Sequence, residues 1–117
     1  MPDLHAHFKL WISSDTYEGS FGTGKLRLLQ AIDETGSLQN AVKTLGISYR
    51  KAWGDLKKAE ACLQCKLIDK TRGGQGGGHT VVTDQGRRVI LAYAEMNGVV
   101  LQGLNQAFEG FVEEVKG

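Results

Sequence analysis

The sequence predicts a mainly α-helical fold with one small β-hairpin: a winged helix-turn-helix that continues into a long C-terminal dimerisation helix. Two segments of helical periodicity follow one another with only a glycine turn at Gly46 between them. A glycine-rich stretch, residues 73–78, then separates two short segments rich in Leu, Ile, Val and Thr. Apolar residues at helical spacing continue to the end of the chain. This order of elements is typical of a helix-turn-helix followed by a wing and a helix.

Length and composition favour one domain over residues 1–117, since 117 residues with 41% hydrophobic content supply one ordinary core. Within it we expect the helix-turn-helix core and wing in residues 25–83 and the dimerisation helix in residues 84–117. The longest apolar run, residues 89–94, is far shorter than the roughly 18 residues that span a bilayer. Without an export signal or a disulfide framework, we expect a cytoplasmic protein with no membrane partner.

The N-terminal part is expected to hold a strand, a loop and two helices. Residues 7–13 partly alternate between apolar and polar and predict a strand, whereas the polar residues 14–24 predict a loop. Apolar residues at helical spacing then begin at Leu26 and end before Gly36. Ser37 is the expected N-cap of the next helix, which Gly46 ends because glycine adopts the left-handed conformation without a steric penalty.

Ser48 is the expected N-cap of a third helix that continues to about Leu63. Its inward face would consist of Ala52, Trp53, Leu56, Ala59 and Leu63, and its other face carries Arg50, Lys51, Lys57 and Lys58. Residues 67–72 and 80–83 predict the two strands of a hairpin whose tip, residues 73–79, has five glycines in seven positions. A last helix begins at Asp84 and could continue to Val115.

Taken alone, the net charge of +1 argues against a nucleic-acid partner, but it conceals an uneven distribution of charge along the chain. Residues 43–88 contain ten basic and four acidic residues, a balance of +6, while the remainder of the chain has a balance of −5. A basic middle between acidic ends is one sign of a surface that faces a polyanion, although random clustering of surface charge is the alternative.

Together, the third helix and the hairpin predict binding of double-stranded DNA. The N-terminus of the helix could enter a major groove about 12 Å wide, where Arg50 suits a guanine edge, Tyr49 a hydrogen bond or stacking contact, and Lys51 a phosphate. Glycines at the hairpin tip would let the backbone approach the duplex; a merely flexible loop is the alternative. The expected DNA-binding residues are Ser37, Gln39, Ser48, Tyr49, Arg50, Lys51, Lys58, Arg72, Gly74, Gln75, Gly76, Gly77, His79 and Thr80.

Several blocks of sequence resemble a known family. These are Gly36-Ser37-Leu38-Gln39-Asn40-Ala41-Val42, then Gly46-Ile47-Ser48-Tyr49-Arg50-Lys51-Ala52-Trp53, and the glycine-rich residues 71–78 with residues 82–86. They resemble the DNA-binding domain of ModE-type molybdate-responsive transcriptional regulators, with a wider similarity to LysR-type helix-turn-helix domains. The resemblance covers roughly residues 25–93 and implies a dimeric transcriptional regulator. Because the oxyanion-binding domains of that family have no counterpart here, we expect neither molybdate binding nor any other cofactor.

The last predicted helix carries a continuous apolar stripe. A helix of about 30 residues would be about 45 Å long, more than so small a domain can cover, so its protruding part should pair with a second copy. Gly98, Gly103 and Gly110 could kink or break it, and folding back on its own core is the alternative. The expected dimer interface consists of Val89, Tyr93, Met96, Val100, Leu104, Phe108 and Phe111.

Two further motifs predict little. Residues 19–25 match the first seven positions of a phosphate-binding P-loop, but Leu26 replaces the Ser or Thr that would hold Mg²⁺. Cys62 and Cys65 form a single CxxC pair, which could bind zinc only if His5 and His7 folded back onto it. No catalytic constellation is present, so we expect neither an enzyme nor a metal site.

A sequence-specific DNA-binding transcriptional regulator is therefore the expected function. The alternative is a winged-helix module for protein docking or dimerisation without DNA binding, because this fold also serves such roles. The basic pair Arg50 and Lys51 and the glycine-rich wing favour DNA.

Overall fold

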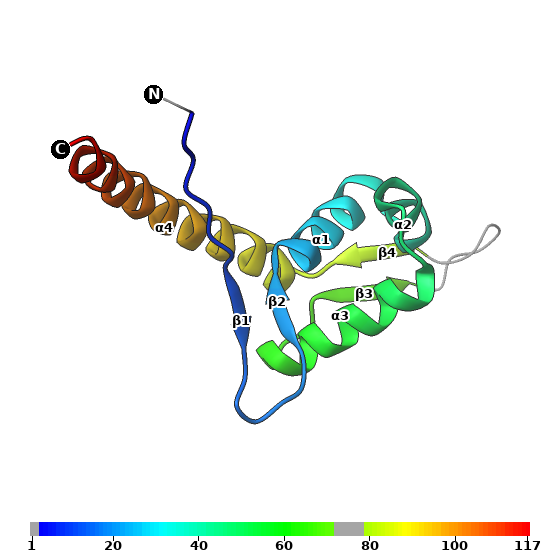
Figure 1. Cartoon of the computed structure of the whole chain (residues 1–117). Coiled ribbons are helices and arrows are strands. Elements are labelled where there is room, and N and C mark those ends of the chain that lie inside the picture. Colours follow the sequence, from blue (N-terminus) through cyan, green and yellow to red (C-terminus); the bar gives the residue numbers. More distant parts are fainter. Residues whose placement is uncertain (1–2, 72–78) are drawn as a thin grey trace.

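The computed structural model describes residues 3–71 and 79–117 and shows a helical body from which one long helix extends (Figure 1). In chain order the elements are β1 (Trp11–Ser13), β2 (Ser20–Gly22), α1 (Thr23–Thr35), α2 (Leu38–Leu45), α3 (Tyr49–Leu63), β3 (Ile68–Thr71), β4 (His79–Val82) and α4 (Asp84–Lys116). The predicted winged helix-turn-helix with a long C-terminal helix is confirmed.

The strands form two separate antiparallel pairs. In the first pair Ile12 of β1 lies opposite Phe21 of β2, and in the second Ile68 of β3 lies opposite Val82 of β4. The second pair is the predicted hairpin. The first corrects the sequence reading, because the expected loop over residues 14–24 contains β2 and the start of α1. Phe21 is fully buried, so its packing into the core holds a strand among residues that are locally polar and glycine-rich.

Side-chain caps and left-handed glycines set the boundaries of the helix-turn-helix. The Ser37 hydroxyl accepts a hydrogen bond from the Asn40 N–H (3.1 Å), and the Ser48 hydroxyl accepts one from the Lys51 N–H (3.1 Å). Gly36 and Gly46 end α1 and α2 with φ of 71° and 69°, where a side chain would be strained. Both predicted caps and both predicted stops are confirmed.

The core lies between α1, α2, α3, the two hairpins and the first turns of α4. Its fully buried large side chains are Phe21, Leu28, Leu29, Ile32, Leu38, Leu56 and Leu67. Trp53 and Leu63, expected to face inward, are only partly buried and pack against the edge of this core. The remaining exposed surface of Trp53 is available to the site described below.

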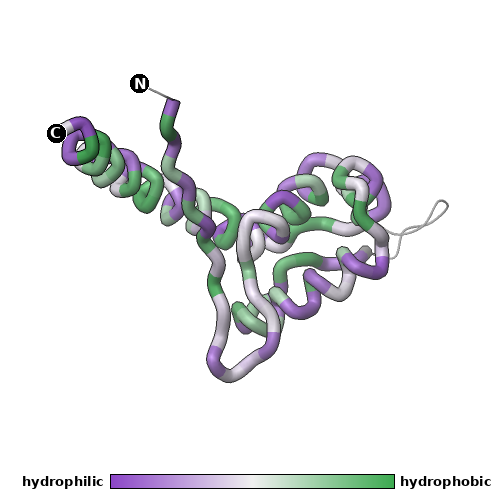
Figure 2. Tube along the Cα trace, in the orientation of Figure 1, coloured by the Kyte–Doolittle hydropathy of each residue, from purple (hydrophilic) through white to green (hydrophobic). Residues whose placement is uncertain are grey.

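Helix α4 runs unbroken for 33 residues, so the break considered at its glycines does not occur. Each glycine costs about 1 kcal/mol relative to alanine but leaves the backbone hydrogen bonds intact. Only Gly86 and Tyr93 are buried, and beyond them the helix extends away from the body (Figure 1). The molecule is consequently 67 Å long but only 32 and 22 Å across. Hydrophobic residues nevertheless continue along the extended part (Figure 2).

Tyr93 marks the point where α4 leaves the core. Its ring packs edge-on against Phe21 at 5.6 Å between centroids, and its hydroxyl donates a hydrogen bond to the Leu10 carbonyl (2.7 Å). Only 3% of Tyr93 is exposed. Its expected place in a dimer interface is therefore wrong, since the N-terminal strand region and β2 already cover it.

Among the described residues, no helix is both long enough and apolar enough to cross a membrane.

Candidate nucleic-acid interface

The first turn of α3 projects three exposed side chains, Tyr49, Arg50 and Lys51, beside the hairpin of β3 and β4, which we call the wing. The Ser48 cap holds the backbone of this turn, and Ala52 and Leu56 anchor the helix through their fully buried side chains. The turn is thus rigid at its base and open at its surface, as recognition by a helix N-terminus requires.

The basic side chains on this surface differ in whether a carboxylate forms an ion pair with them. Lys51 forms an ion pair with Asp55 one turn later (2.9 Å), so a phosphate would compete with that carboxylate. Arg50 has no ion pair with any carboxylate in the part of the chain that the structure describes. Arg50 is therefore the better candidate for a direct contact with a base edge.

A cluster of aromatic and basic side chains connects α3 to the wing, and we call it the wing clamp: Tyr49, Trp53, Lys57 and Lys70. The Lys70 ammonium group lies 4.6 Å from the ring centroid of Trp53 and 5.4 Å from that of Tyr49, and it donates a hydrogen bond to the Tyr49 hydroxyl (2.7 Å). The Lys57 ammonium group also lies 4.6 Å from the ring centroid of Trp53. Sequence reasoning missed Trp53 and Lys70 as site residues, because residue 70 meets residues 49 and 53 only through the fold.

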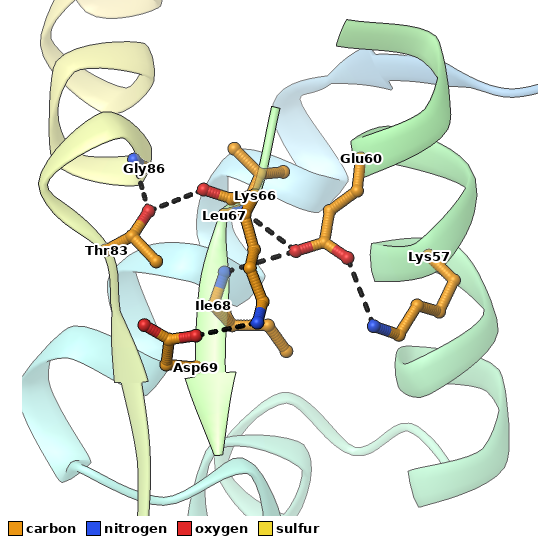
Figure 3. Close-up of polar contacts among 8 residues, drawn as sticks. All are labelled: Lys57, Glu60, Lys66, Leu67, Ile68, Asp69, Thr83 and Gly86. Carbon is orange, nitrogen blue, oxygen red and sulfur yellow. Dashed lines mark hydrogen bonds and ion pairs between the residues drawn. The ribbon is translucent and has the colours of Figure 1, made fainter. Parts of the chain in front are cut away.

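Hydrogen bonds also fix the base of the wing. Figure 3 shows Glu60 of α3 reaching the start of β3, where its carboxylate accepts hydrogen bonds from the N–H groups of Leu67 (2.8 Å) and Ile68 (3.3 Å). On the other side, the Thr83 hydroxyl donates to the Lys66 carbonyl (2.6 Å) and accepts from the Gly86 N–H (2.9 Å). The wing is therefore attached at its base to both α3 and α4.

Gly86 is part of the same attachment, because a Cβ there would lie 2.5 Å from the Leu67 carbonyl oxygen. Only glycine lets the first turn of α4 approach β3 this closely.

The predicted wing residues have different outcomes. Arg72, Gly74, Gln75, Gly76 and Gly77 lie outside the described residues. His79 is exposed in β4, whereas only 4% of its neighbour Thr80 is exposed. Thr80 as a DNA-binding residue is therefore wrong: its N–H bonds the Gly36 carbonyl (3.3 Å), and its side chain faces the body because strand residues alternate between faces.

The other predicted contacts lie on two elements. The Ser37 hydroxyl is occupied as the cap of α2, and Gln39 is exposed in the first turn of that helix. Lys58 is exposed on α3, and its backbone passes close to Gly19, where a Cβ would lie 2.6 Å from the Lys58 carbonyl oxygen. Within the described residues, no side-chain hydrogen bond or ion pair joins Ser37, Gln39 and Lys58 to one another.

The P-loop-like residues 19–25 form β2 and the first turn of α1. They contribute to a groove of about 640 Å³ between the first hairpin, the start of α1 and α3. Its charged lining is mostly basic: Lys9, Lys25, Arg27 and Lys51, with Asp55 as the one acidic member. This excess of positive charge extends the basic surface of α3 toward α1.

The two cysteines form no recognisable metal centre. The Cys62 thiol lies 3.9 Å from the Ile12 carbonyl oxygen, and burial, with a smaller contribution from Glu60, raises the pKa of the Cys65 thiol. A raised pKa keeps that thiol protonated and unreactive at neutral pH. Within residues 3–71 and 79–117, no three His, Cys, Asp or Glu side chains gather in a way that could hold a metal ion.

The residues predicted for the dimer interface differ in burial before and after Tyr93. Val89 packs partly against the core, whereas Met96, Val100 and Phe111 are exposed and Leu104 and Phe108 are partly buried. Phe108 and Phe111 stack at 6.3 Å between centroids. Further exposed apolar side chains that were not predicted as interface residues are Leu91, Val99 and Leu101.

Comparisons with known proteins agree with this geometry. The chain is 35% identical over 83 residues to the molybdenum transport protein ModE of Azotobacter vinelandii, which covers 70% of this chain and 31% of that protein. It is 32% identical to the molybdenum-pterin-binding protein MopB of Rhodobacter capsulatus, over 72% of this chain and 31% of that protein. It is 35% identical to the DNA-binding transcriptional dual regulator ModE of Escherichia coli, over 59% of this chain and 26% of that protein. The chain thus spans less than a third of the length of these relatives.

A solved structure shares the fold. The crystal structure of ArgP from Mycobacterium tuberculosis superimposes with a TM-score of 0.51 and 18% sequence identity, over 72% of this chain and 30% of that one. Residues 23–87, from the start of α1 into the first turns of α4, match the bacterial regulatory helix-turn-helix proteins of the lysR family. Since this match covers more than half of the chain, the protein belongs to the LysR family of helix-turn-helix proteins.

Proposed function

We propose that this protein binds duplex DNA sequence-specifically and thereby regulates transcription. The observation that carries the proposal is the first turn of α3, where Arg50, which pairs with no carboxylate of the described residues, lies on an exposed helix N-terminus beside a wing attached at its base. A helix N-terminus with such side chains is suited to the major groove, and a wing to the adjacent backbone or minor groove.

The names of the relatives support this proposal. One of them is a DNA-binding transcriptional dual regulator, and two are named for molybdenum. The aligned part is the helix-turn-helix region, which the resemblance to ModE-type regulators associates with DNA. We therefore assign DNA binding to this chain and expect no molybdate binding by these 117 residues.

We further propose that α4 pairs with α4 of a second copy. Its exposed apolar residues beyond Tyr93, including Val99, Val100 and Phe111, would be buried in an isologous interface. A twofold dimer would present two α3 helices to half-sites about one helical turn apart.

The decisive experiment measures Arg50→Ala in fluorescence anisotropy on two duplexes: one selected by footprinting of genomic fragments and one of unrelated sequence. Loss of a bidentate contact to guanine should weaken specific binding by about 1–3 kcal/mol, roughly 5- to 150-fold, and relax the preference at one base position. Lys116→Ala is the charge-matched control, since it removes one positive charge at the far end of α4.

Two results would contradict the proposal in different ways. An equal loss on both duplexes would mean that Arg50 holds a phosphate and reads no base. A wild-type protein that binds neither duplex at low salt would favour the alternative of a docking module without DNA binding.

A further inference from the structure

Among the lysines of α3, β3 and the segment between them, Lys70 differs from three others in how it is held. Lys51, Lys57 and Lys66 each pair with a carboxylate: Asp55 at 2.9 Å, Glu60 at 3.2 Å and Asp69 at 2.9 Å. Lys70 has no such pair within the described residues. Its ammonium is held instead by the face of the Trp53 ring and by the Tyr49 hydroxyl.

This difference in partner changes what each charge can do. A carboxylate cancels the field of the lysine that it pairs with, whereas a ring face or a hydroxyl fixes an ammonium group and leaves its full positive charge. Lys70 is therefore both positioned and uncompensated. An ammonium group has three N–H donors, and the hydrogen bond to Tyr49 uses one of them, so donors are left for an anion.

The position of Lys70 makes a DNA phosphate the fitting anion. Lys70 lies in β3, the first strand of the wing, and its ammonium lies beside the first turn of α3. When a recognition helix occupies the major groove, the phosphate backbone runs along its flank, between the helix and the wing.

We propose that Lys70 binds a phosphate of the DNA backbone and that Tyr49 and Trp53 position its ammonium group, so that α3 and the wing approach the duplex as one unit. This inference rests on the proposed DNA-binding function and adds a contact to it. It also revises the expected role of Tyr49, whose hydroxyl accepts a hydrogen bond from Lys70.

The test measures affinity as a function of NaCl concentration for the full chain on the footprint-selected duplex. Lys70→Met keeps most of the apolar stem and removes the charge. It should weaken binding about tenfold near physiological salt and lower the slope of log affinity against log salt by about 0.9 for each protomer bound. Lys70→Arg should retain the slope, because the charge remains.

Lys66→Met is the matched control, since Lys66 lies four residues earlier and its charge is already paired with Asp69. It should leave affinity within about twofold of wild type and the slope unchanged. Tyr49→Phe removes only the hydroxyl, so it should weaken binding severalfold in the wild-type background and have no further effect in the Lys70→Met background.

The outcomes separate this inference from the function on which it rests. A wild-type protein that binds no duplex would overturn the proposed function and this inference with it. Wild-type binding with an unchanged slope in Lys70→Met would overturn only the phosphate contact. A Tyr49→Phe effect as large in the Lys70→Met background as in wild type would overturn the positioning role of Tyr49. Thermal melts of each variant show whether a loss of binding reflects unfolding.

Discussion

Helices α3 and α4 are both amphipathic, yet they use their apolar faces differently. The apolar face of α3 is covered within the chain, and Ala52, Leu56 and Ala59 have no exposed surface. The outer part of α4 has no such cover, and Val99, Leu101 and Phe111 are 66%, 43% and 58% exposed. The same helical pattern therefore stabilises the monomer in α3 and leaves an exposed apolar surface in α4.

This contrast has a simple physical origin. A body of this size offers α4 a contact surface only over its first turns, where Gly86 and Tyr93 are buried. Beyond Tyr93 the apolar side chains of α4 are at most partly buried by the described residues, and several are exposed. Association with a second copy is the proposed way to remove that apolar surface from water.

The largest expected effect comes from comparing matched leucines. Leu56→Ala removes a fully buried side chain of α3 and should lower the free energy of unfolding by about 2–5 kcal/mol. Leu101→Ala removes the same atoms from an exposed position of α4 and should change it by less than about 0.5 kcal/mol under conditions where the protein is monomeric. Urea titration of both variants checks the difference, and equal losses would contradict the contrast between the helices.

The second prediction concerns association. Phe111→Asp places a charge in the C-terminal part of the exposed stripe and should weaken the dimer by at least about 100-fold, or roughly 3 kcal/mol, without lowering the melting temperature of the monomer. Gln106→Glu adds the same charge on another face of α4 and should leave the dimer intact. Sedimentation velocity over a concentration series measures both. A wild-type chain that sediments as a monomer at micromolar concentration would end the dimer proposal.

The smallest expected effect concerns Tyr93, where the part of α4 that packs against the core meets the part that is exposed. Tyr93→Phe keeps the edge-on contact with Phe21 but removes the hydroxyl that bonds the Leu10 carbonyl. It should cost about 1 kcal/mol of stability. Tyr17→Phe, at a residue that is 44% exposed, is the control and should cost nothing measurable by thermal denaturation. If Tyr93→Phe left the thermal stability unchanged, the part of α4 that packs against the core would have to end at a residue other than Tyr93.

Much of the helix-turn-helix could be predicted because its signals are local. Ser37, Gly46 and Ser48 act on backbone groups within four residues of themselves, and all three perform the predicted role. The first hairpin could not be predicted in the same way. β2 exists because Phe21 finds its place against Tyr93, a residue that lies 72 positions later in the chain.

The site shows the same division. Arg50 and Tyr49 are identifiable from their place after a helix cap, whereas Lys70 gains its role from two rings that lie about twenty residues earlier. Thr80 was misassigned because sequence proximity to the glycine-rich tip does not say which face of β4 a side chain occupies. The alternation of the strand and its hydrogen bond to Gly36 decide that.

The sequence by itself determined the order of the elements from α1 onward, the stops of α1 and α2, the caps of α2 and α3, the basic middle of the chain and the long apolar stripe. Each of these depends on residue type and short-range spacing, which the chain carries without folding. Only the tertiary structure decided that Tyr93 belongs to the core, that Glu60 and Thr83 hold the base of the wing, and that the Lys70 ammonium group lies against Tyr49 and Trp53. Burial and these contacts are properties of neighbours in space, and folding brings those neighbours together from separate elements of the chain.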